Sequence, residues 1–365
     1  MRVKLKTLML GAAATALLAG QALAEKIIIG HFGNPTPMQL LSTTDELAKA
    51  TGWEIEWRKF DAGTDVIAAM ASGDVVLSEL GSSPIAIGAS SGLEFELIAY
   101  SDVIGKAESL IARKDSGIAS VADLKGKTVA VPIGSTAHYS LMGALQYEGI
   151  AEADVNIVGM KPDDIAAAWG QGTIDAAWIW QPVQSEILKT GTFVIGADQT
   201  AAWGFPTYDG WVVNKAFADA NPDKIVAFLK AVDKVNGMYL ANPAAWTADS
   251  AEVKALAAAT GADPAQVPGI LEGFTFLPMA EQAGEAWLGS AAPKIKVTAE
   301  FLKGAGRIDG VAAPTAGSPS DRHTGLLEGK DVALDGAGAH LVDVGKLSGR
   351  ARGGCRGPQF FHERI

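Results

Sequence analysis

The feature that most constrains the fold is the alternation of short apolar segments with helical stretches between Glu25 and Gly310. Apolar runs rich in β-branched residues predict strands, and the amphipathic segments between them predict helices. The clearest strands are KIIIGHF (26–32), EIEWRKF (54–60) and VVLSEL (75–80), with helices expected at 38–51 and 64–72. This alternation favours an α/β fold with mixed, mostly parallel sheets, because each helix carries the chain back to the start of the next strand.

Residues suited to ligand binding follow the ends of three predicted strands. They are Ser82 and Ser83 in GSSPIAI, Ser135, Thr136 and His138 in VPIGSTAHYSL, and Trp178 and Trp180 in DAAWIW. Ser-Ser-Pro predicts a cap followed by a proline in the first helical position. In open α/β sheets the ligand crevice lies at the carboxyl ends of the strands, so we expect these residues to line it.

The N-terminus has the three parts of a secretory signal peptide. Basic residues at 2, 4 and 6 precede the apolar run LMLGAAATALLAG, and a small-residue cleavage sequence ends at Ala24. The run is too short to span a bilayer, which needs about 20 residues, so an uncleaved anchor is disfavoured. We therefore predict a signal peptide at 1–24, export to the periplasm and a soluble mature protein.

Charge and cysteine content exclude several functions. The formal net charge is −11 and the chain has no basic run, which gives no electrostatic footprint for nucleic acid or for an anionic membrane surface. Any bound anion must therefore be held by local geometry. The single cysteine, Cys355, allows no intramolecular disulfide, so the fold must be stabilised by its core alone.

Composition changes near Gly310. The segment 311–365 contains none of the nine tryptophans, three of the five histidines and the stretch SGRARGGCRG. Because it has little hydrophobic periodicity, we predict a poorly ordered tail. It is either the product of a frameshift in a GC-rich gene or a genuine extension, and we expect no functional role for its cysteine or for His323.

The motifs GSSPIAI, VPIGSTAHYSL, WIWQP and WGFPTYDGWVV, in this order and spacing, resemble the periplasmic taurine-binding components of taurine ABC importers, within the aliphatic sulfonate-binding family. The resemblance extends from the leader to about Gly310. It implies a type II periplasmic binding protein fold, in which two α/β lobes joined by two crossings close on a ligand like a hinge. We place lobe one at 25–112 and 212–310 and lobe two at 113–211, with crossings near Ala112 and Asp209.

The function implied by the resemblance is capture of taurine or a related small sulfonate by a monomer, for delivery to the membrane permease of an ABC importer. A sulfonate has three oxygens and one delocalised charge, and helix N-termini supply N–H donors and partial positive charge without Arg or Lys. The candidates for this end of the ligand are Ser82, Ser83, Ser135, Thr136 and His138. Helix capping is the alternative role for the serines, and a buried, hydrogen-bonded imidazole is the alternative for His138.

The ammonium end of taurine requires a carboxylate and aromatic faces. Asp209 in GFPTYDGWVV is the candidate carboxylate, because the chain is expected to return to lobe one there. Candidate walls are Trp178, Trp180 and Trp203, with His31 and Phe32 at the end of the first strand. Ordinary core packing is the alternative for each tryptophan. The loop GNPTPMQ after the first strand departs from the family pattern.

Other functions fit the sequence less well. There is no G-x-S-x-G elbow for a hydrolase and no H-E-x-x-H zinc motif, and the body contains just His31 and His138. Enzymes that synthesise the thiamine pyrimidine share the expected fold but use histidine and cysteine residues that this body does not have. We therefore predict no catalytic residue, metal or cofactor. The alternative ligands are alkanesulfonates or another small anion such as nitrate, for which an unpaired Asp209 would be unfavourable.

Overall fold

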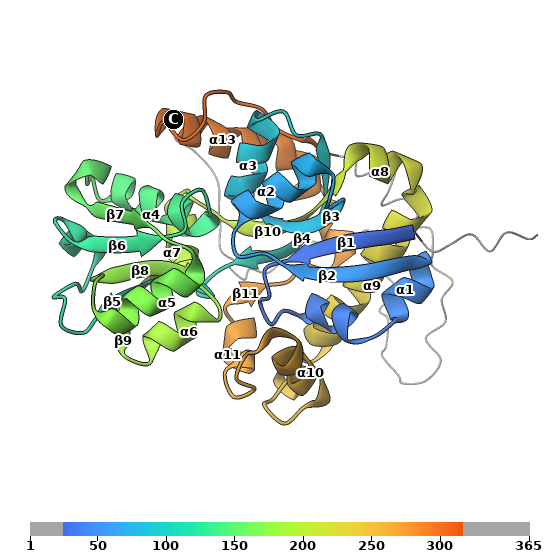
Figure 1. Ribbon diagram of the computed structural model, residues 1–365, viewed down its shortest axis with the longest axis horizontal. Helices are drawn as coiled ribbons and strands as arrows, with labels where there is room; N and C mark the ends of the chain where they lie inside the picture. Colours follow the sequence, from blue (N-terminus) through green and yellow to red (C-terminus); the bar gives the residue numbers. More distant parts are fainter. Residues whose placement is uncertain (1–24, 317–365) are drawn as a thin grey trace, which may run out of the picture. The chain divides into compact units, whose positions relative to one another are not determined.

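The computed structural model describes residues 25–316. The predicted signal peptide at 1–24 and residues 317–365 of the predicted tail lie outside the described residues. Two β-sheets form the centres of two lobes, and helices pack on both faces of each sheet (Figure 1). The α/β fold class is therefore confirmed. None of the helices within residues 25–316 is long and apolar enough to cross a membrane.

The sheet of lobe one has the strand order β11-β4-β10-β3-β1-β2, with β12 paired to β4. Its strands are β1 (Glu25–His31), β2 (Trp53–Lys59), β3 (Leu77–Gly81), β4 (Phe95–Ile104), β10 (Tyr208–Asn214), β11 (Phe274–Thr275) and β12 (Thr315–Ala316). β1 pairs in parallel with β2 and β3, whereas β10 runs antiparallel to β3 and β4. Side chains alternate along β1, so Ile27 and Ile29 pack into one core and Ile28 packs against the other.

Helices cover both faces of this sheet. One face carries α2 (Gly63–Ser72), α3 (Ser82–Ser90) and α13 (Ala291–Gly304). The other carries η1 (Pro37–Thr43), α1 (Glu46–Thr51), α8 (Lys215–Ala220) and α9 (Pro222–Ala241). A further cluster beside β11 involves α10 (Ala251–Thr260) and α11 (Val267–Leu271). The shorter elements are η4 (Pro243–Ala245), α12 (Met279–Gln282) and η5 (Leu288–Ser290).

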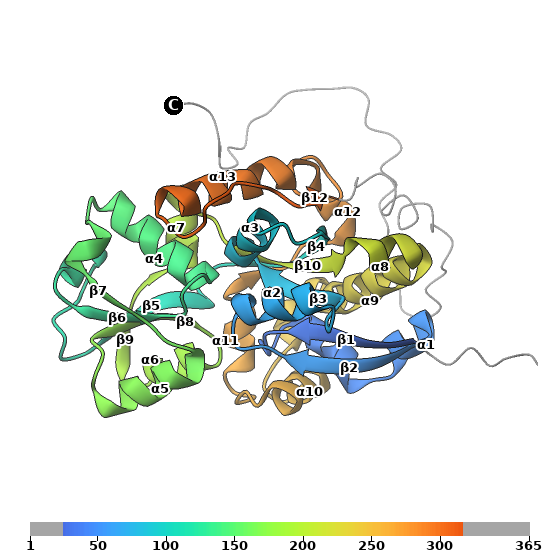
Figure 2. The ribbon, with the colours of Figure 1, turned by 45° about the horizontal axis from the view of Figure 1, so that its top comes forward.

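The sheet of lobe two is separate from that of lobe one in Figure 2, and its strand order is β7-β6-β8-β5-β9. Its strands are β5 (Glu108–Arg113), β6 (Thr128–Val131), β7 (Asn156–Gly159), β8 (Ala176–Trp180) and β9 (Gly191–Gly196). Its helices are η2 (Val121–Leu124), α4 (Thr136–Tyr147), η3 (Glu152–Asp154), α5 (Pro162–Gln171), α6 (Val183–Leu188) and α7 (Ala197–Ala202). α4 packs on one face, and α5 and α6 pack on the other.

The two crossings between the sheets lie earlier in the chain than the sequence indicates. β4 ends in the first sheet at Ile104 and β5 begins in the second at Glu108, and the chain returns between α7 and β10. We therefore propose crossings at 105–107 and 203–207 instead of near Ala112 and Asp209. The physical reason is that β5 pairs with β8 and β9 of the second sheet. This pairing depends on residues far away in the chain, so the sequence of β5 alone does not indicate it.

The helix expected at 38–51 is interrupted. η1 ends at Thr43 and α1 begins at Glu46. At the end of η1, the hydroxyls of Ser42 and Thr43 donate to the backbone carbonyls of Gln39 and Leu40. Such local side-chain hydrogen bonds compete with helical ones, which explains the break.

The first residues of the predicted tail pack against lobe one. Thr315–Ala316 pair with β4, and the Ala312 N–H donates to the Ser90 hydroxyl. Val311 and Ala313 contact the core beneath α13. The ordered body therefore continues past Gly310 to at least Ala316, because these residues add a strand to the sheet.

Candidate functional site

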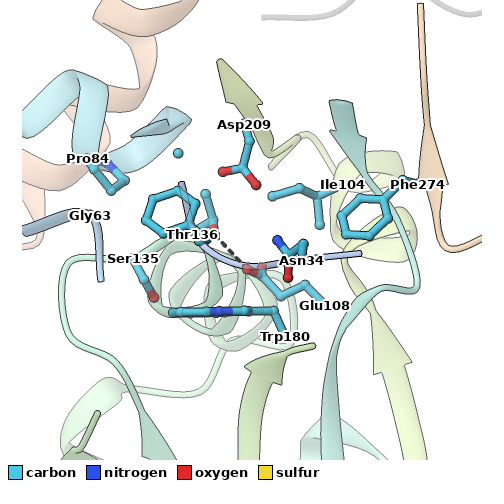
Figure 3. A pocket seen from close by; sticks show the side chains of 12 residues that line it. Asn34, Gly63, Pro84, Ile104, Glu108, Ser135, Thr136, Trp180, Asp209 and Phe274 are labelled. Carbon is cyan, nitrogen blue, oxygen red and sulfur yellow. Dashed lines mark hydrogen bonds between the residues drawn. The ribbon is translucent and has the colours of Figure 1, made fainter. Parts of the chain in front are cut away.

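A narrow, partly open pocket lies between the two lobes (Figure 3). Its apolar walls are Phe32, Pro84, Ile104, Trp180 and Phe274. Its polar side chains are Asn34, Glu108, Ser135, Thr136 and Asp209. The lining contains two carboxyl groups and no lysine, arginine or histidine, so the pocket is acidic.

Two helix N-termini from different lobes meet at this pocket. Gly81 is the N-cap of α3, and Ser135 is the N-cap of α4. A Cβ atom on Gly81 would lie 2.8 Å from Thr136 Cγ2 and 3.3 Å from Asp209 Oδ1. The absence of a side chain at Gly81 therefore allows the close approach of the two lobes.

Ser82 and Ser83 lie inside the first turn of α3 instead of capping it. The helix begins at Ser82, which puts Pro84 in the third helical position, two residues later than the sequence indicates. Neither serine lines the pocket; the Ser82 hydroxyl accepts from the Tyr208 N–H (3.4 Å), and the Ser83 hydroxyl donates across the lobes to the Gly134 carbonyl (3.4 Å). Because no side chain caps α3 and Pro84 has no N–H, the backbone N–H groups of Ser82 and Ser83 are the ones that α3 can offer to an anion.

Ser135 and Thr136 line the pocket, but their hydroxyl protons are already used. Ser135 Oγ accepts from the His138 N–H (3.1 Å) and donates to the Pro132 carbonyl (2.6 Å). Thr136 Oγ1 donates to Glu108 Oε2 (2.6 Å). Both side chains therefore offer lone pairs to the pocket, and the donors at this end are backbone N–H groups.

His138 is fully buried and does not line the pocket, contrary to expectation. Its Nδ1 accepts from the Gly134 N–H at 3.2 Å, and burial lowers its pKa to about 4. The imidazole is therefore neutral at physiological pH with its proton on Nε2. This hydrogen bond fixes the turn before α4, because the imidazole of His138, in the first turn of the helix, is the acceptor for the N–H of Gly134 in the preceding loop.

Glu108 and Asp209 are the two carboxyl groups of the pocket. Glu108 accepts from Thr136 and, at 3.4 Å, from the Ser140 hydroxyl. Burial raises the pKa of Glu108 to about 7. Burial, together with the neighbouring carboxyl groups of Glu79 and Glu108, raises the pKa of Asp209 well above its usual value. A cation that entered this pocket would stabilise both ionised forms.

Two further buried carboxyl groups lie behind the pocket. Asp102 in β4 faces Asp209 in the strand register, and Glu79 in β3 accepts from the Ser101 hydroxyl at 2.6 Å. Burial raises the pKa of both groups, that of Glu79 to about 7. Within residues 25–316, no group of three or more His, Cys, Asp or Glu side chains has the arrangement to bind a metal ion.

The predicted aromatic walls are divided between the pocket and other places. Trp180 and Phe32 line the pocket. Trp178 is fully buried in the core of lobe two beside α4, and Trp203 stacks on Tyr147 with ring centroids 4.0 Å apart. His31 opens onto a separate groove, where its Nδ1 lies 2.8 Å from Gln39 Nε2. Trp178 and Trp180 share one face of β8, so their different places depend on position along the strand, which alternation does not give.

Seven lining residues were not among the sequence candidates: Asn34, Gly63, Gly81, Pro84, Ile104, Glu108 and Phe274. A glutamate at the start of the apolar run ESLIAR was a signal for Glu108, because a charged residue in a buried strand needs a role. Asn34 lies in the loop GNPTPMQ, and Phe274 comes from β11, which is distant in sequence from β4, its partner strand. Nothing local in the sequence indicates either contact.

Two α/β lobes with a pocket between them are the architecture of two-lobed solute-binding proteins. A family model described as NMT1/THI5 like matches residues 49–246. The taurine-binding periplasmic protein of Escherichia coli (strain K12) is 37% identical over 300 residues, which cover 82% of this chain and 93% of that protein. The chain belongs to this family of periplasmic solute-binding proteins, as its sequence motifs suggest.

Solved structures agree on the fold. The alkanesulfonate-binding protein SsuA from Xanthomonas axonopodis pv. citri bound to MOPS superposes with a TM-score of 0.65 at 21% identity, covering 78% of this chain and 95% of that one. The desulfurization enzyme DSZB gives a TM-score of 0.58 at 14% identity, covering 83% of this chain and 99% of that one. The fold is thus shared by binding proteins and by an enzyme, so function must be argued from the pocket.

Proposed function

We propose that this chain captures taurine, or a closely related aminosulfonate, in the periplasm and delivers it to the membrane permease of an ABC importer. Its relatives are named as taurine-binding and aliphatic sulfonates-binding proteins, and one as an ABC transporter periplasmic binding protein. The predicted signal peptide supports the compartment. A monomer is sufficient, because both halves of the pocket come from one chain.

The observation that carries the proposal is the pairing of helix N-termini with carboxyl groups in one small pocket. The sulfonate oxygens accept from the first-turn N–H groups of α3 and α4, and Asp209 takes the ammonium. Two methylene groups separate the sulfonate and ammonium ends of taurine. Trp180 and Phe32 cover the methylene groups.

A zwitterion suits this pocket better than a simple anion. An alkanesulfonate or nitrate would bring a negative charge toward Glu108 and Asp209 with no cation in the lining to balance them. Desolvating unpaired charges costs on the order of several kcal/mol. Taurine supplies the missing positive charge, so we expect it to bind more tightly than ethanesulfonate.

A thermal-shift and calorimetric screen of taurine, ethanesulfonate, sulfate and nitrate tests the proposal. A ligand at about 100 times its Kd raises the melting temperature of a protein of this size by roughly 4 °C. We expect taurine to give this shift and the simple anions to give much smaller ones. A larger shift with ethanesulfonate than with taurine would assign the site to alkanesulfonates.

We propose binding without turnover. The pocket lining contains no cysteine or histidine, and Ser135 donates its hydroxyl proton to the Pro132 carbonyl, not to a base. Mass spectrometry of taurine incubated with the protein is expected to recover the ligand unchanged. Any stoichiometric or catalytic product would favour an enzyme.

A further inference from the structure

We propose that Glu108 and Asn34 join Asp209 in a three-acceptor site that selects a primary ammonium group. This inference rests on the proposed aminosulfonate function and specifies which side chains recognise the amine. The three side chains come from three separate segments, namely β5, the loop after β1, and β10. In Figure 3 they surround one space, with Asn34 beside Glu108 and Asp209 opposite.

Glu108 has acceptor capacity to spare. Each of its oxygens accepts one hydroxyl hydrogen bond, Oε2 from Thr136 and Oε1 from Ser140. A carboxylate has about four lone-pair positions, so two are left for a ligand. The two hydroxyl donors hold the carboxylate in one orientation, with 1% of the residue exposed. A cationic donor is the natural partner for such a buried group.

Asn34 contributes an acceptor with no partner. It is 6% exposed and lines the pocket, and its Oδ1 atom has no hydrogen bond among the described residues. Its backbone is held by the turn in which its carbonyl accepts from the Thr36 N–H at 2.8 Å. A buried, unpaired amide oxygen is unfavourable, and a ligand N–H at this place would remove that cost.

Three acceptors match the three N–H bonds of a primary ammonium. Each N-methyl group replaces one donor by an apolar group and adds volume beside a charged acceptor. A trimethylammonium offers no donor at all. We therefore expect the binding affinity to fall from taurine to N-methyltaurine and again to trimethyltaurine. A site that recognises only positive charge would bind all three with similar affinity.

Isothermal calorimetry with these three ligands on the wild-type protein is the first test. We expect each methylation to weaken binding by roughly tenfold or more. If the wild type binds taurine but binds trimethyltaurine equally well, the three-acceptor site is wrong and the proposed function stands. If the wild type binds no aminosulfonate, the proposed function itself fails.

Variants then separate the acceptors. Glu108→Gln keeps the shape but removes the charge, so both amines should bind about 30-fold more weakly while ethanesulfonate is unaffected or gains. Asn34→Ala removes one neutral acceptor and should bring the affinities of taurine and N-methyltaurine close together. Asn34→Asp keeps an acceptor and should preserve the preference.

Glu79→Gln is the matched control. Glu79 is as buried as Glu108 and belongs to the same group of carboxyls, but it does not line the pocket. Losing its charge should leave the ratio of taurine to N-methyltaurine affinity unchanged. An equal change of this ratio in Glu79→Gln and Asn34→Ala would overturn the assignment. If Glu108→Gln fails to fold, the wild-type ligand series and the two Asn34 variants still decide.

Discussion

At the scale of single residues, Asp209→Asn separates charge from shape. The substitution keeps the size and hydrogen bonding of the side chain but removes the charge proposed to meet the ligand ammonium. Losing a desolvated charge pair typically costs about 2–5 kcal/mol, and each 1.4 kcal/mol is about tenfold. Calorimetry should therefore show taurine affinity lowered by roughly 30-fold to 1,000-fold or more.

Ethanesulfonate is the control ligand for this variant, because it has no ammonium. Its affinity should stay the same or rise when the carboxylate is removed. Equal weakening of both ligands would instead make Asp209 a structural carboxylate that supports the start of α3, near Gly81.

The sequence predicted the roles of residues whose contacts lie nearby in the chain. It did not predict the roles of residues whose contacts come from distant segments. Ser135 was expected at a helix start, and it caps α4. The direction of the Thr136 hydroxyl could not be predicted, because it depends on Glu108, 28 positions earlier and in another strand. Trp178 and Trp180 illustrate the same limit: both lie in β8, yet one is core and the other is pocket wall.

At the scale of elements, the meeting of α3 and α4 predicts an unusual effect for Gly81→Ala. Gly81 has φ −68° and ψ 154°, which alanine adopts readily, so lobe one should tolerate it. The new methyl group would, however, lie 2.8 Å from Thr136 Cγ2 of lobe two. The contacts within lobe one, 3.3 Å to Asp209 Oδ1 and 3.4 Å to Pro84 Cδ, need only small shifts, whereas the clash with Thr136 arises when the lobes approach. Taurine affinity should therefore fall by roughly tenfold or more with little change in ligand-free melting temperature.

Thr136→Ser provides the matched rescue, because serine keeps the hydroxyl that donates to Glu108 but has no Cγ2. The double variant Gly81→Ala/Thr136→Ser should recover most of the lost affinity. A large drop in the ligand-free melting temperature of Gly81→Ala would show that the clash lies within lobe one.

Elements themselves were largely predictable, apart from their ends. β1, β2 and α2 lie within one residue of the expected bounds, because their apolar periodicity is strong. α3 begins two residues early because Gly81, at the end of β3, becomes its cap. η1 and α1 were merged because the hydroxyl hydrogen bonds that separate them have no apolar signature.

At the scale of the whole molecule, buried carboxyl groups set the pH dependence of stability. Glu79 and Glu108 have pKa values raised by burial to about 7 from 4.5, and the pKa values of Asp102 and Asp209 are raised in the same direction. Between pH 4.5 and about 7 the folded protein keeps protons that the unfolded chain releases. Stability from these groups is therefore present below pH 4.5 and is lost as the pH rises through about 7.

The two buried histidines have the opposite effect on folding stability, and they act over a different pH range. Burial lowers the pKa values of His31 and His138 from 6.5 to about 4, so the unfolded chain binds more protons at these two positions between pH 4 and 6.5. This partly offsets the carboxyl effect below pH 6.5. Above that pH the carboxyl groups act alone, and ligand-free stability should fall most clearly from there to about pH 7.5.

Taurine should reverse part of this loss, because its ammonium stabilises the ionised forms of Asp209 and Glu108. Binding at neutral pH then releases protons, so affinity should rise with pH until these carboxyl groups are ionised without ligand.

Thermal melts from about pH 5.5 to about pH 8 with and without taurine test both effects together. We expect the ligand-free melting temperature to fall over this range while the taurine-induced shift grows. A shift that is larger at the acidic end than at the basic end would mean that the bound ligand does not use the ionised carboxylates, and would contradict the zwitterion site.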